Sequence, residues 1–244
     1  MIKVNALSCG YQKTVLQNIT FECSQNIAIL GANGVGKSTL AKALCGLLPF
    51  KGEITLNNKA IHKYTPQERA KTITYIPPKL SSFDDFISVE EFVLMGRYPH
   101  KMALDNYTTH DKERVQQLLQ SYNIQASKSI SELSSGQQQL ILIAQALAQE
   151  SQIIIFDEPT ANLDPKHAFD FYKALQNLPI NTQKVLITHD LQFAATLGYS
   201  VLFLDEEGVR FYEDPTTFFT AENLSHCYGI TFSPLAQTFG VCYE

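Results

Sequence analysis

The chain has 244 residues, of which 45% are hydrophobic, and a formal net charge of −5. This length and composition allow one large domain, or a domain with an inserted subdomain, and exclude bulk disorder. The acidic balance and the lack of any Lys/Arg run argue against a nucleic-acid partner, and no apolar run is long enough to span a membrane.

The first quarter of the chain predicts β-structure followed by a strand, a glycine-rich loop and a helix. Alternating apolar residues indicate two strands around a turn at residues 10–13. A short apolar run then leads without a break into the stretch GANGVGKST. After this stretch, leucines and alanines recur at the spacing of one helical face. We expect strands at residues 2–7, 16–22, 26–30 and 52–56, and a helix at 38–47.

The remaining chain predicts helices first and then strands alternating with helices. Residues 84–150 are mostly helical in pattern, and Asp214-Pro215 has the residues of a helix start. We expect helices at 89–95, 111–122 and 137–150, and strands at 73–77, 152–156, 184–188, 200–204 and 209–212. Strands alternating with helices indicate an α/β sheet with a helical insert between roughly residues 80 and 150.

The stretch GANGVGKST has the spacing of a P-loop, which holds phosphates. Glycines let the backbone curl its N–H groups toward one anion, and the following helix adds its positive N-terminal end. Lys37 can reach the β- and γ-phosphates, and the Ser38 hydroxyl can ligate Mg²⁺. The alternative is a chance match in a glycine-rich turn, which the flanking strand and helix argue against. The expected nucleotide contacts here are Gly31, Asn33, Gly34, Gly36, Lys37, Ser38 and Thr39.

An acidic pair, Asp157 and Glu158, ends the strand expected at 152–156. The carboxyl ends of parallel strands form the edge where α/β proteins bind ligands. Neighbouring strand residues point to opposite faces, but we expect the chain to be turning already at this position. Asp157 can hold Mg²⁺ directly or through water, and Glu158 can accept a proton from an attacking water. The alternative is two solvated acids that open a loop.

The stretch LSSGQ precedes a predicted helix, and IIIFDEPTANLD follows shortly after it. With the P-loop, these motifs closely resemble the ATP-binding cassette (ABC) ATPases, whose signature reads Leu-Ser-Gly-Gly-Gln and whose Walker B strand runs into Asp-Glu-Pro-Thr. The resemblance covers essentially the whole chain. It implies an α/β fold, a P-loop NTPase core of ABC type with an N-terminal antiparallel β subdomain and an inserted α-helical subdomain. Residues 1–244 then form one ABC ATPase domain, with about 1–80 and 151–244 as catalytic core and β subdomain, and about 81–150 as helical insert.

The resemblance implies ATP and Mg²⁺ as ligands and roles for further residues. Tyr11 matches the aromatic residue that stacks on adenine, Asp164 the D-loop aspartate and His189 the switch histidine. With Glu158 as the base, Lys37 and His189 are expected to stabilise charge on the transferring phosphoryl group. The plainer alternatives are a surface turn residue for Tyr11 and a satisfied core histidine for His189.

The signature also has a physical interpretation, since a serine and a glycine before a helix form a second anion site. One ATP rarely needs two such sites from one chain. The resemblance implies that a second copy faces the first, so that each signature caps the ATP of the other copy. An ordinary helix N-cap is the alternative for the serines. The signature residues are Ser134, Ser135, Gly136 and Gln137.

Two positions depart from the family motifs. Pro78 stands where the family has the Q-loop glutamine, and proline offers no side-chain oxygen to Mg²⁺ or water. Either the alignment slips by a residue or two, or this contact is missing and Mg²⁺ is coupled more weakly to the loop. Ser135 replaces a family glycine, so we expect modest crowding beside the phosphate path.

The run GRYPH and the tail YGITFSPL resemble the ATPases of bacterial importers for ferric siderophores, haem and cobalamin. Manganese and zinc importers are a close alternative, and an ATPase of iron–sulfur cluster assembly is an alternative outside transport. The plain interpretation of Arg97 in GRYPH is a solvated arginine at a helix stop. The importer interpretation implies integral-membrane permease partners, a substrate-binding protein acting indirectly, and a peripheral location on the cytoplasmic face of the bacterial inner membrane.

Overall fold

The computed structural model describes residues 1–80, 87–102, 105–161 and 163–232. The chain falls into two compact units. Unit 1 comprises Met1–Tyr64, Ile155–Glu158 and Gln183–Glu244, and unit 2 comprises Thr65–Ile154 and Pro159–Thr182. The expected helical insert falls inside the sequence range of unit 2, and the organisation as a single ABC domain stays a prediction.

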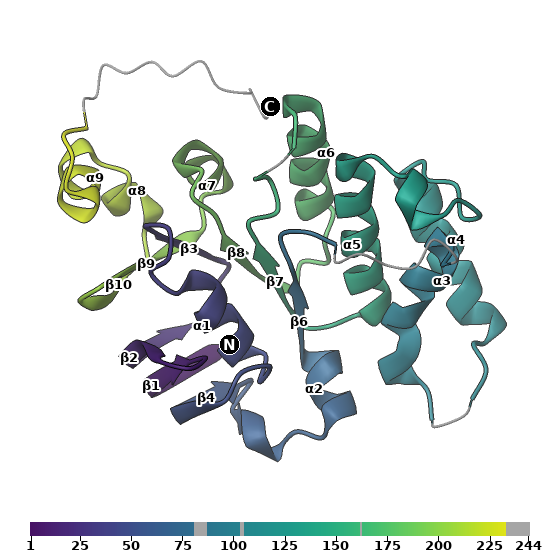
Figure 1. The fold of residues 1–244 in the computed structure, drawn as a ribbon, viewed down its shortest axis with the longest axis horizontal. Helices are drawn as coiled ribbons and strands as arrows, with labels where there is room; N and C mark the ends of the chain where they lie inside the picture. Colours follow the sequence, from purple (N-terminus) through teal and green to yellow (C-terminus); the bar gives the residue numbers. More distant parts are fainter. Residues whose placement is uncertain (81–86, 103–104, 162, 233–244) are drawn as a thin grey trace. The chain divides into compact units, whose positions relative to one another are not determined.

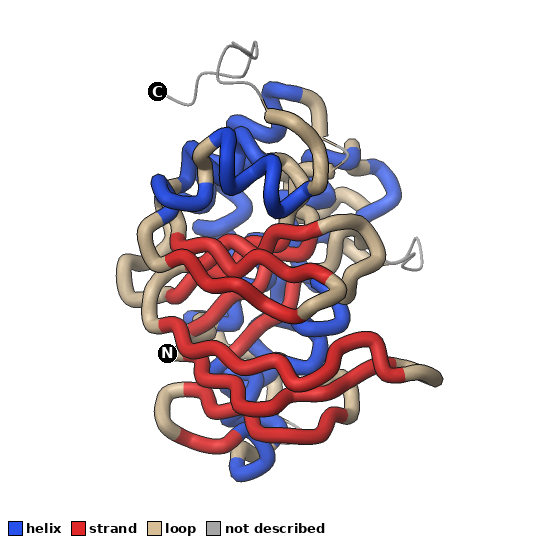
Figure 2. Tube along the Cα trace, turned by 90° about the vertical axis from the view of Figure 1, so that its left-hand side faces the viewer, coloured by secondary structure: helices blue, strands red, loops and turns tan. Residues whose placement is uncertain are grey.

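An antiparallel sheet with strand order β2-β1-β4-β5 forms one layer of unit 1 (Figure 2). In β1, Ile2 and Val4 are buried and alternate with exposed residues, because one face of the sheet covers the core. Gly10 lies opposite Thr14, so the predicted turn closes a hairpin between β1 and β2. The strands are β1 (Ile2–Gly10), β2 (Thr14–Cys23), β4 (Phe50–Leu56) and β5 (Lys59–Ala60).

The second sheet has the strand order β10-β9-β3-β8-β7-β6. In unit 1, β3 pairs in parallel with both β8 and β9, and every residue of β3 and β8 is buried, as expected for strands covered on both faces. β7 passes from unit 2 into unit 1 at Ile155. The strands are β3 (Ile27–Gly31), β6 (Ile73–Ile76), β7 (Ile153–Asp157), β8 (Gln183–Ile187), β9 (Ser200–Asp205) and β10 (Gly208–Tyr212).

In unit 1, α1 contacts β3, and α8 contacts β9 and β10. Helix α1 contacts β1 and β2 of the first sheet and β3 of the second, so it lies between the two layers. Its buried residues include Leu40 and Leu44, which form the apolar face predicted from the sequence. The helices are α1 (Lys37–Leu44), α7 (Leu191–Leu197), α8 (Pro215–Phe218) and α9 (Ala221–Tyr228).

Unit 2 is mainly helical, with α5 contacting α3, α4 and α6 (Figure 1). Helices α2, α3, α4 and α5 each begin with a capping box, in which an N-cap Ser or Thr and the acidic or amide residue three positions on satisfy each other's backbone N–H groups. The helices are α2 (Pro66–Thr72), α3 (Val89–Leu94), α4 (Thr109–Ser121), α5 (Ser135–Gln149) and α6 (Pro165–Gln176), with a 3₁₀ segment at Met95–His100.

Most differences from the predicted elements concern helix ends and short helices. Helix α1 ends at Leu44 instead of residue 47 because Gly46 adopts a left-handed conformation, with φ of 63°. The predicted helix start at Asp214-Pro215 is confirmed, because Asp214 caps α8. Helices α2, α6, α7 and α9 were not predicted from the sequence. In the part of the chain that the structure describes, no helix is both long and apolar enough to cross a bilayer.

Candidate functional site

The P-loop of unit 1 connects β3 to α1 and depends on glycine at two tight positions. Gly31 has a φ of 147°, and a Cβ there would lie 2.1 Å from the carbonyl oxygen of Leu204. Gly36 has a φ of 111°, and its Cβ would lie 2.7 Å from Leu16 Cδ2. Glycine avoids strain at both positive φ values, so the loop can keep the curl that lets backbone N–H groups face one anion.

Lys37, the first residue of α1, is only 6% exposed. Its ammonium donates to the carbonyl oxygens of Gly31 and Ala32, each at 2.9 Å. Burial lowers the pKa of Lys37, while the nearby carboxylates Glu158 and Asp157 oppose this shift. The lysine is therefore held at the mouth of the loop, within the field of both predicted acidic residues.

Ser38 and Asp157 offer two adjacent oxygen ligands. The Ser38 hydroxyl donates to Oδ1 of Asp157 at 3.1 Å, although the residues are 119 positions apart. Octahedral Mg²⁺ holds oxygen ligands at about 2.1 Å, which places adjacent ligands about 3 Å apart. The observed separation fits such a pair of ligands. Asp157 is 1% exposed, so the alternative of two solvated acids is wrong for this residue.

Glu158 follows β7, and its backbone no longer has the extended conformation of the strand. Its φ is 49°, and its N–H donates to the carbonyl oxygen of Ile187 at 2.9 Å. The chain therefore turns at this residue, as the sequence predicts. The Glu158 carboxylate lies 2.7 Å from Nδ1 of His189, whose side chain is 57% exposed. His189 is thus not a core histidine, and it orients the carboxylate that the sequence predicts as the base.

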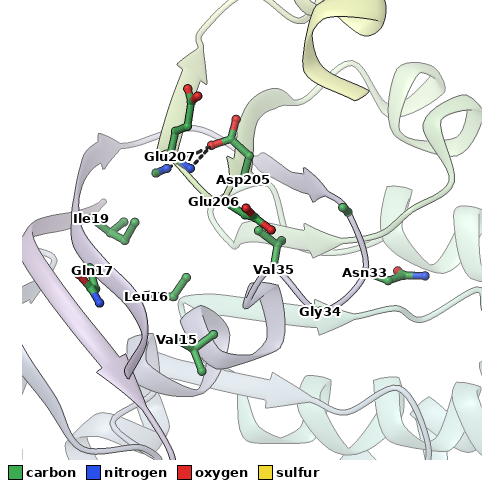
Figure 3. A pocket seen from close by; sticks show the side chains of 12 residues that line it. Val15, Leu16, Gln17, Ile19, Asn33, Gly34, Val35, Asp205, Glu206 and Glu207 are labelled. Atoms are coloured by element: carbon green, nitrogen blue, oxygen red, sulfur yellow. Dashed lines mark hydrogen bonds between the residues drawn. The ribbon is translucent and has the colours of Figure 1, made fainter. Parts of the chain in front are cut away.

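Residues of the P-loop line a cavity of about 830 Å³ (Figure 3). Asn33, Gly34 and Val35 line it from the loop, and Val15 and Leu16 from β2. The acidic turn between β9 and β10 lines a further side and is fixed by hydrogen bonds to Asp205 Oδ1 from the N–H groups of Glu207 and Gly208, at 2.9 and 3.1 Å.

Tyr11 lies in the turn between β1 and β2 and is 62% exposed. Its hydroxyl accepts a hydrogen bond from Lys42 Nζ at 3.0 Å. An open ring face is compatible with stacking on a base, and it is equally what a surface turn residue would show. Adenine stacking at Tyr11 therefore stays a prediction.

The signature residues lie in unit 2, at the start of α5. Ser134 is the N-cap: its hydroxyl accepts from the N–H of Gln137 at 3.3 Å, and its own N–H donates to Gln137 Oε1 at 3.1 Å. The plain N-cap alternative thus describes the local geometry, and a role toward ATP stays a prediction. Gly136 lies against the ring of His167 on α6, a residue that the sequence analysis did not identify.

Pro78 and Ser135, the two departures from the family motifs, line one cavity of about 310 Å³ in unit 2. Gln139 also lines it and is 5% exposed, and its side-chain nitrogen has no hydrogen-bond partner among the described residues. Ser135 and Pro78 thus border the same cavity. The loop after β6 presents no side-chain amide at Pro78, and the expectation of a missing contact stays a prediction.

Arg97, in the GRYPH run, is buried in unit 2 and 5% exposed, so the interpretation as a solvated arginine is wrong. It donates to Asp111 at 2.8 Å and to the carbonyl oxygen of Ala148 at 2.7 Å, and it lies 2.9 Å from Glu150. Burial raises the pKa of Asp111, but hydrogen bonds from Arg97 and Thr108 outweigh it and hold that pKa at about 2. Arg97 therefore joins α4 and the end of α5.

Replacing Arg97 with alanine is expected to lower the free energy of unfolding by about 3 kcal/mol, because Asp111 would remain buried without its counter-charge. The depressed Asp111 pKa stabilises the wild type above about pH 4, and this contribution is lost as the pH falls toward about 2. Denaturant unfolding at several pH values measures both effects. Arg114→Ala is the control, because Arg114 lies 3.9 Å from the half-exposed Glu150. Equal losses for both variants would contradict the buried pair.

The site combines a P-loop lysine, two nearby carboxylates and the ends of parallel strands. This combination defines a P-loop nucleoside triphosphatase. Residues 16–161 match the family model described as ABC transporter, so the chain belongs to the ABC transporter family as an ATP-hydrolysing subunit. The predicted ABC-type fold is also confirmed.

Two relatives and one solved structure resemble this chain over most of its length. The chain is 35% identical to the ferric enterobactin transport ATP-binding protein FepC of Escherichia coli, over 92% of this chain and 85% of that protein. It is 34% identical to the manganese transport system ATP-binding protein MntB of Halalkalibacterium halodurans, over 93% of this chain and 92% of that protein. A solved ABC transporter in an inward-facing conformation, described as of metal-chelate type, has a TM-score of 0.78 at 30% identity, over 94% of this chain and 89% of that one.

Proposed function

We propose that this chain is the ATP-hydrolysing subunit of a bacterial importer, in which two copies bind ATP and Mg²⁺ between them and drive a separate membrane permease. The observation that carries the proposal is the constellation of Lys37, Asp157, Glu158 and His189 in unit 1. The proposed location is the cytoplasmic face of the inner membrane, with the chain bound peripherally to its permease.

In the proposed reaction, the P-loop N–H groups hold the phosphates and Lys37 leaves the carbonyls of Gly31 and Ala32 to reach the β- and γ-oxygens. Glu158 accepts a proton from the attacking water, and its 2.7 Å contact to His189 keeps the carboxylate in place. Bound Mg²⁺, held by Ser38 and Asp157, would neutralise charge on the phosphate oxygens. Lys37 and His189 stabilise the charge that develops on the transferred group.

ATP binding would be converted into motion through different affinities for two states of the dimer. In the closed state each signature, at Ser134 to Gln137, contacts the ATP of the other copy. Hydrolysis and phosphate release remove this shared ligand, so the open state becomes favoured. The helical insert and the loop at Pro78 would pass the movement to the permease, and the transported substrate would not touch this chain.

The proposed cargo is an iron–siderophore, haem or cobalamin. The name of FepC, a ferric enterobactin transport ATP-binding protein, supports this choice. MntB has similar identity and coverage, and its name supports manganese import. Manganese or zinc import is therefore the second candidate. A substrate-binding protein would select the cargo together with the permease.

Membrane fractionation separates import from iron–sulfur cluster assembly. When the chain is expressed with the genes that flank its own, it is expected to sediment with membranes and to co-purify with an integral-membrane protein. Co-purification is read by affinity capture from detergent extracts and mass spectrometry. The matched control is the chain expressed alone, which should remain in the supernatant. Capture of only soluble partners would reject the importer and favour the assembly ATPase.

A further inference from the structure

Helix α6 begins at the predicted D-loop with an aspartate whose two carboxylate oxygens both contact the same histidine. Asp164 is the N-cap, and its Oδ1 accepts from the backbone N–H of His167 at 2.9 Å. Its Oδ2 lies 2.8 Å from Nδ1 of the same histidine. These hydrogen bonds to His167 lower the pKa of Asp164, which therefore stays ionised. The imidazole is thereby fixed in orientation relative to the D-loop.

The same imidazole covers the signature glycine within unit 2. A Cβ built on Gly136 would lie 2.1 Å from Cδ2 of His167 and 2.7 Å from its Nε2. The ring therefore occupies the space that any side chain at position 136 would need. His167 thus touches both the D-loop aspartate and the signature loop of its own chain, by a hydrogen bond on one side and by close packing on the other.

We propose that His167 is a positioning residue that fixes the D-loop and the signature loop of one chain relative to each other. The inference rests on the proposed function, in which both loops act on the ATP held by the second copy. Two loops held as one piece would reach that ATP in a single geometry, and misplacement by a fraction of an ångström slows phosphoryl transfer. In the P-loop, Lys37 is held by Gly31 and Ala32 and Ser38 by Asp157, so we expect ATP affinity and turnover to respond differently.

The test compares kcat with ATP affinity in the purified full-length chain. His167→Ala is expected to lower kcat about tenfold while ATP affinity of a single chain stays within about twofold. His167→Asn should recover most of the loss, because the amide nitrogen of Asn takes the place of Nδ1 and keeps the bond to Asp164. Lys173→Ala is the matched control, since Lys173 lies on the same helix and lines the same cavity as His167, while its ammonium lies over the Phe169 ring of that helix. It should leave kcat unchanged.

Unfolding measurements test the packing contact independently of ATP turnover. In the wild-type background, Gly136→Ala should lower the free energy of unfolding. In the His167→Ala background the loss should be smaller, because the ring no longer opposes the new methyl group. Wild-type kcat in folded His167→Ala, or no recovery in His167→Asn, would overturn the positioning role. A wild-type chain that binds ATP but never hydrolyses it, with or without membrane partners, would instead overturn the proposed function.

Discussion

Glu158→Gln is expected to abolish ATP turnover, lowering kcat by at least about a thousandfold, while ATP remains bound and a dimer of the chain accumulates. The amide has nearly the shape of the carboxylate but cannot take a proton from the attacking water, and general-base catalysis contributes about 10²–10⁴-fold. The closed state then has no route to phosphate release. Phosphate release assays, nucleotide retention and size-exclusion chromatography with ATP measure the three expected results.

The control for this variant is Glu222→Gln, which makes the same charge change on α9 of unit 1. It should hydrolyse ATP as the wild type does. Because His189 contacts the Glu158 carboxylate at 2.7 Å, His189→Ala should also slow turnover, but less than Glu158→Gln does. Turnover of Glu158→Gln near the wild-type rate would discredit Glu158 as the base.

Lys37→Ala is expected to weaken ATP binding about a hundredfold. Its ammonium is nearly buried and already lies at the loop carbonyls, so it can reach the phosphates with little reorganisation. Charge-assisted hydrogen bonds to phosphate are among the strongest in proteins, and alanine removes all of them. Equilibrium binding of a fluorescent ATP analogue measures the loss.

The matched control is Lys3→Ala, because Lys3 forms an exposed ion pair with Glu22 far from the loop in sequence. Exposed pairs of this kind contribute little, so both affinity and stability should stay near wild type. If Lys37→Ala bound ATP as tightly as the control, the assignment of the P-loop would be wrong.

The sequence was sufficient to predict those elements that are specified by residues close together in the chain. The P-loop spacing required glycines at tight backbone positions, and the structure shows positive φ at Gly31 and Gly36 with no room for a Cβ. Asp214-Pro215 predicted a helix start because the N-cap side chain and the proline act within one turn. The short apolar runs at 26–30 and 184–188 likewise predicted strands, and the structure has β3 and β8 there with every residue buried.

Arg97 and His167 were not predicted in the environments that the structure gives them. Burial of Arg97 depends on Asp111 and on Glu150, a residue more than fifty positions away. His167 had one local indication, since it stands three residues after the helix-capping Asp164, but its contact with Gly136 comes from the packing of two helices. Helix α7 spans only seven residues, about two turns, which is too short for a helical period to be recognised in the sequence.

The sequence by itself determined which chemical groups this ATPase subunit possesses: a lysine on a glycine-rich loop, a carboxylate pair after a buried strand and a histidine after another. Only the tertiary structure decided that they share one site, with Ser38 3.1 Å from Asp157 and Glu158 2.7 Å from His189. The physical reason is that hydrophobic periodicity specifies which face of an element is buried. Which strand ends become neighbours depends on the crossovers and packing of the whole sheet.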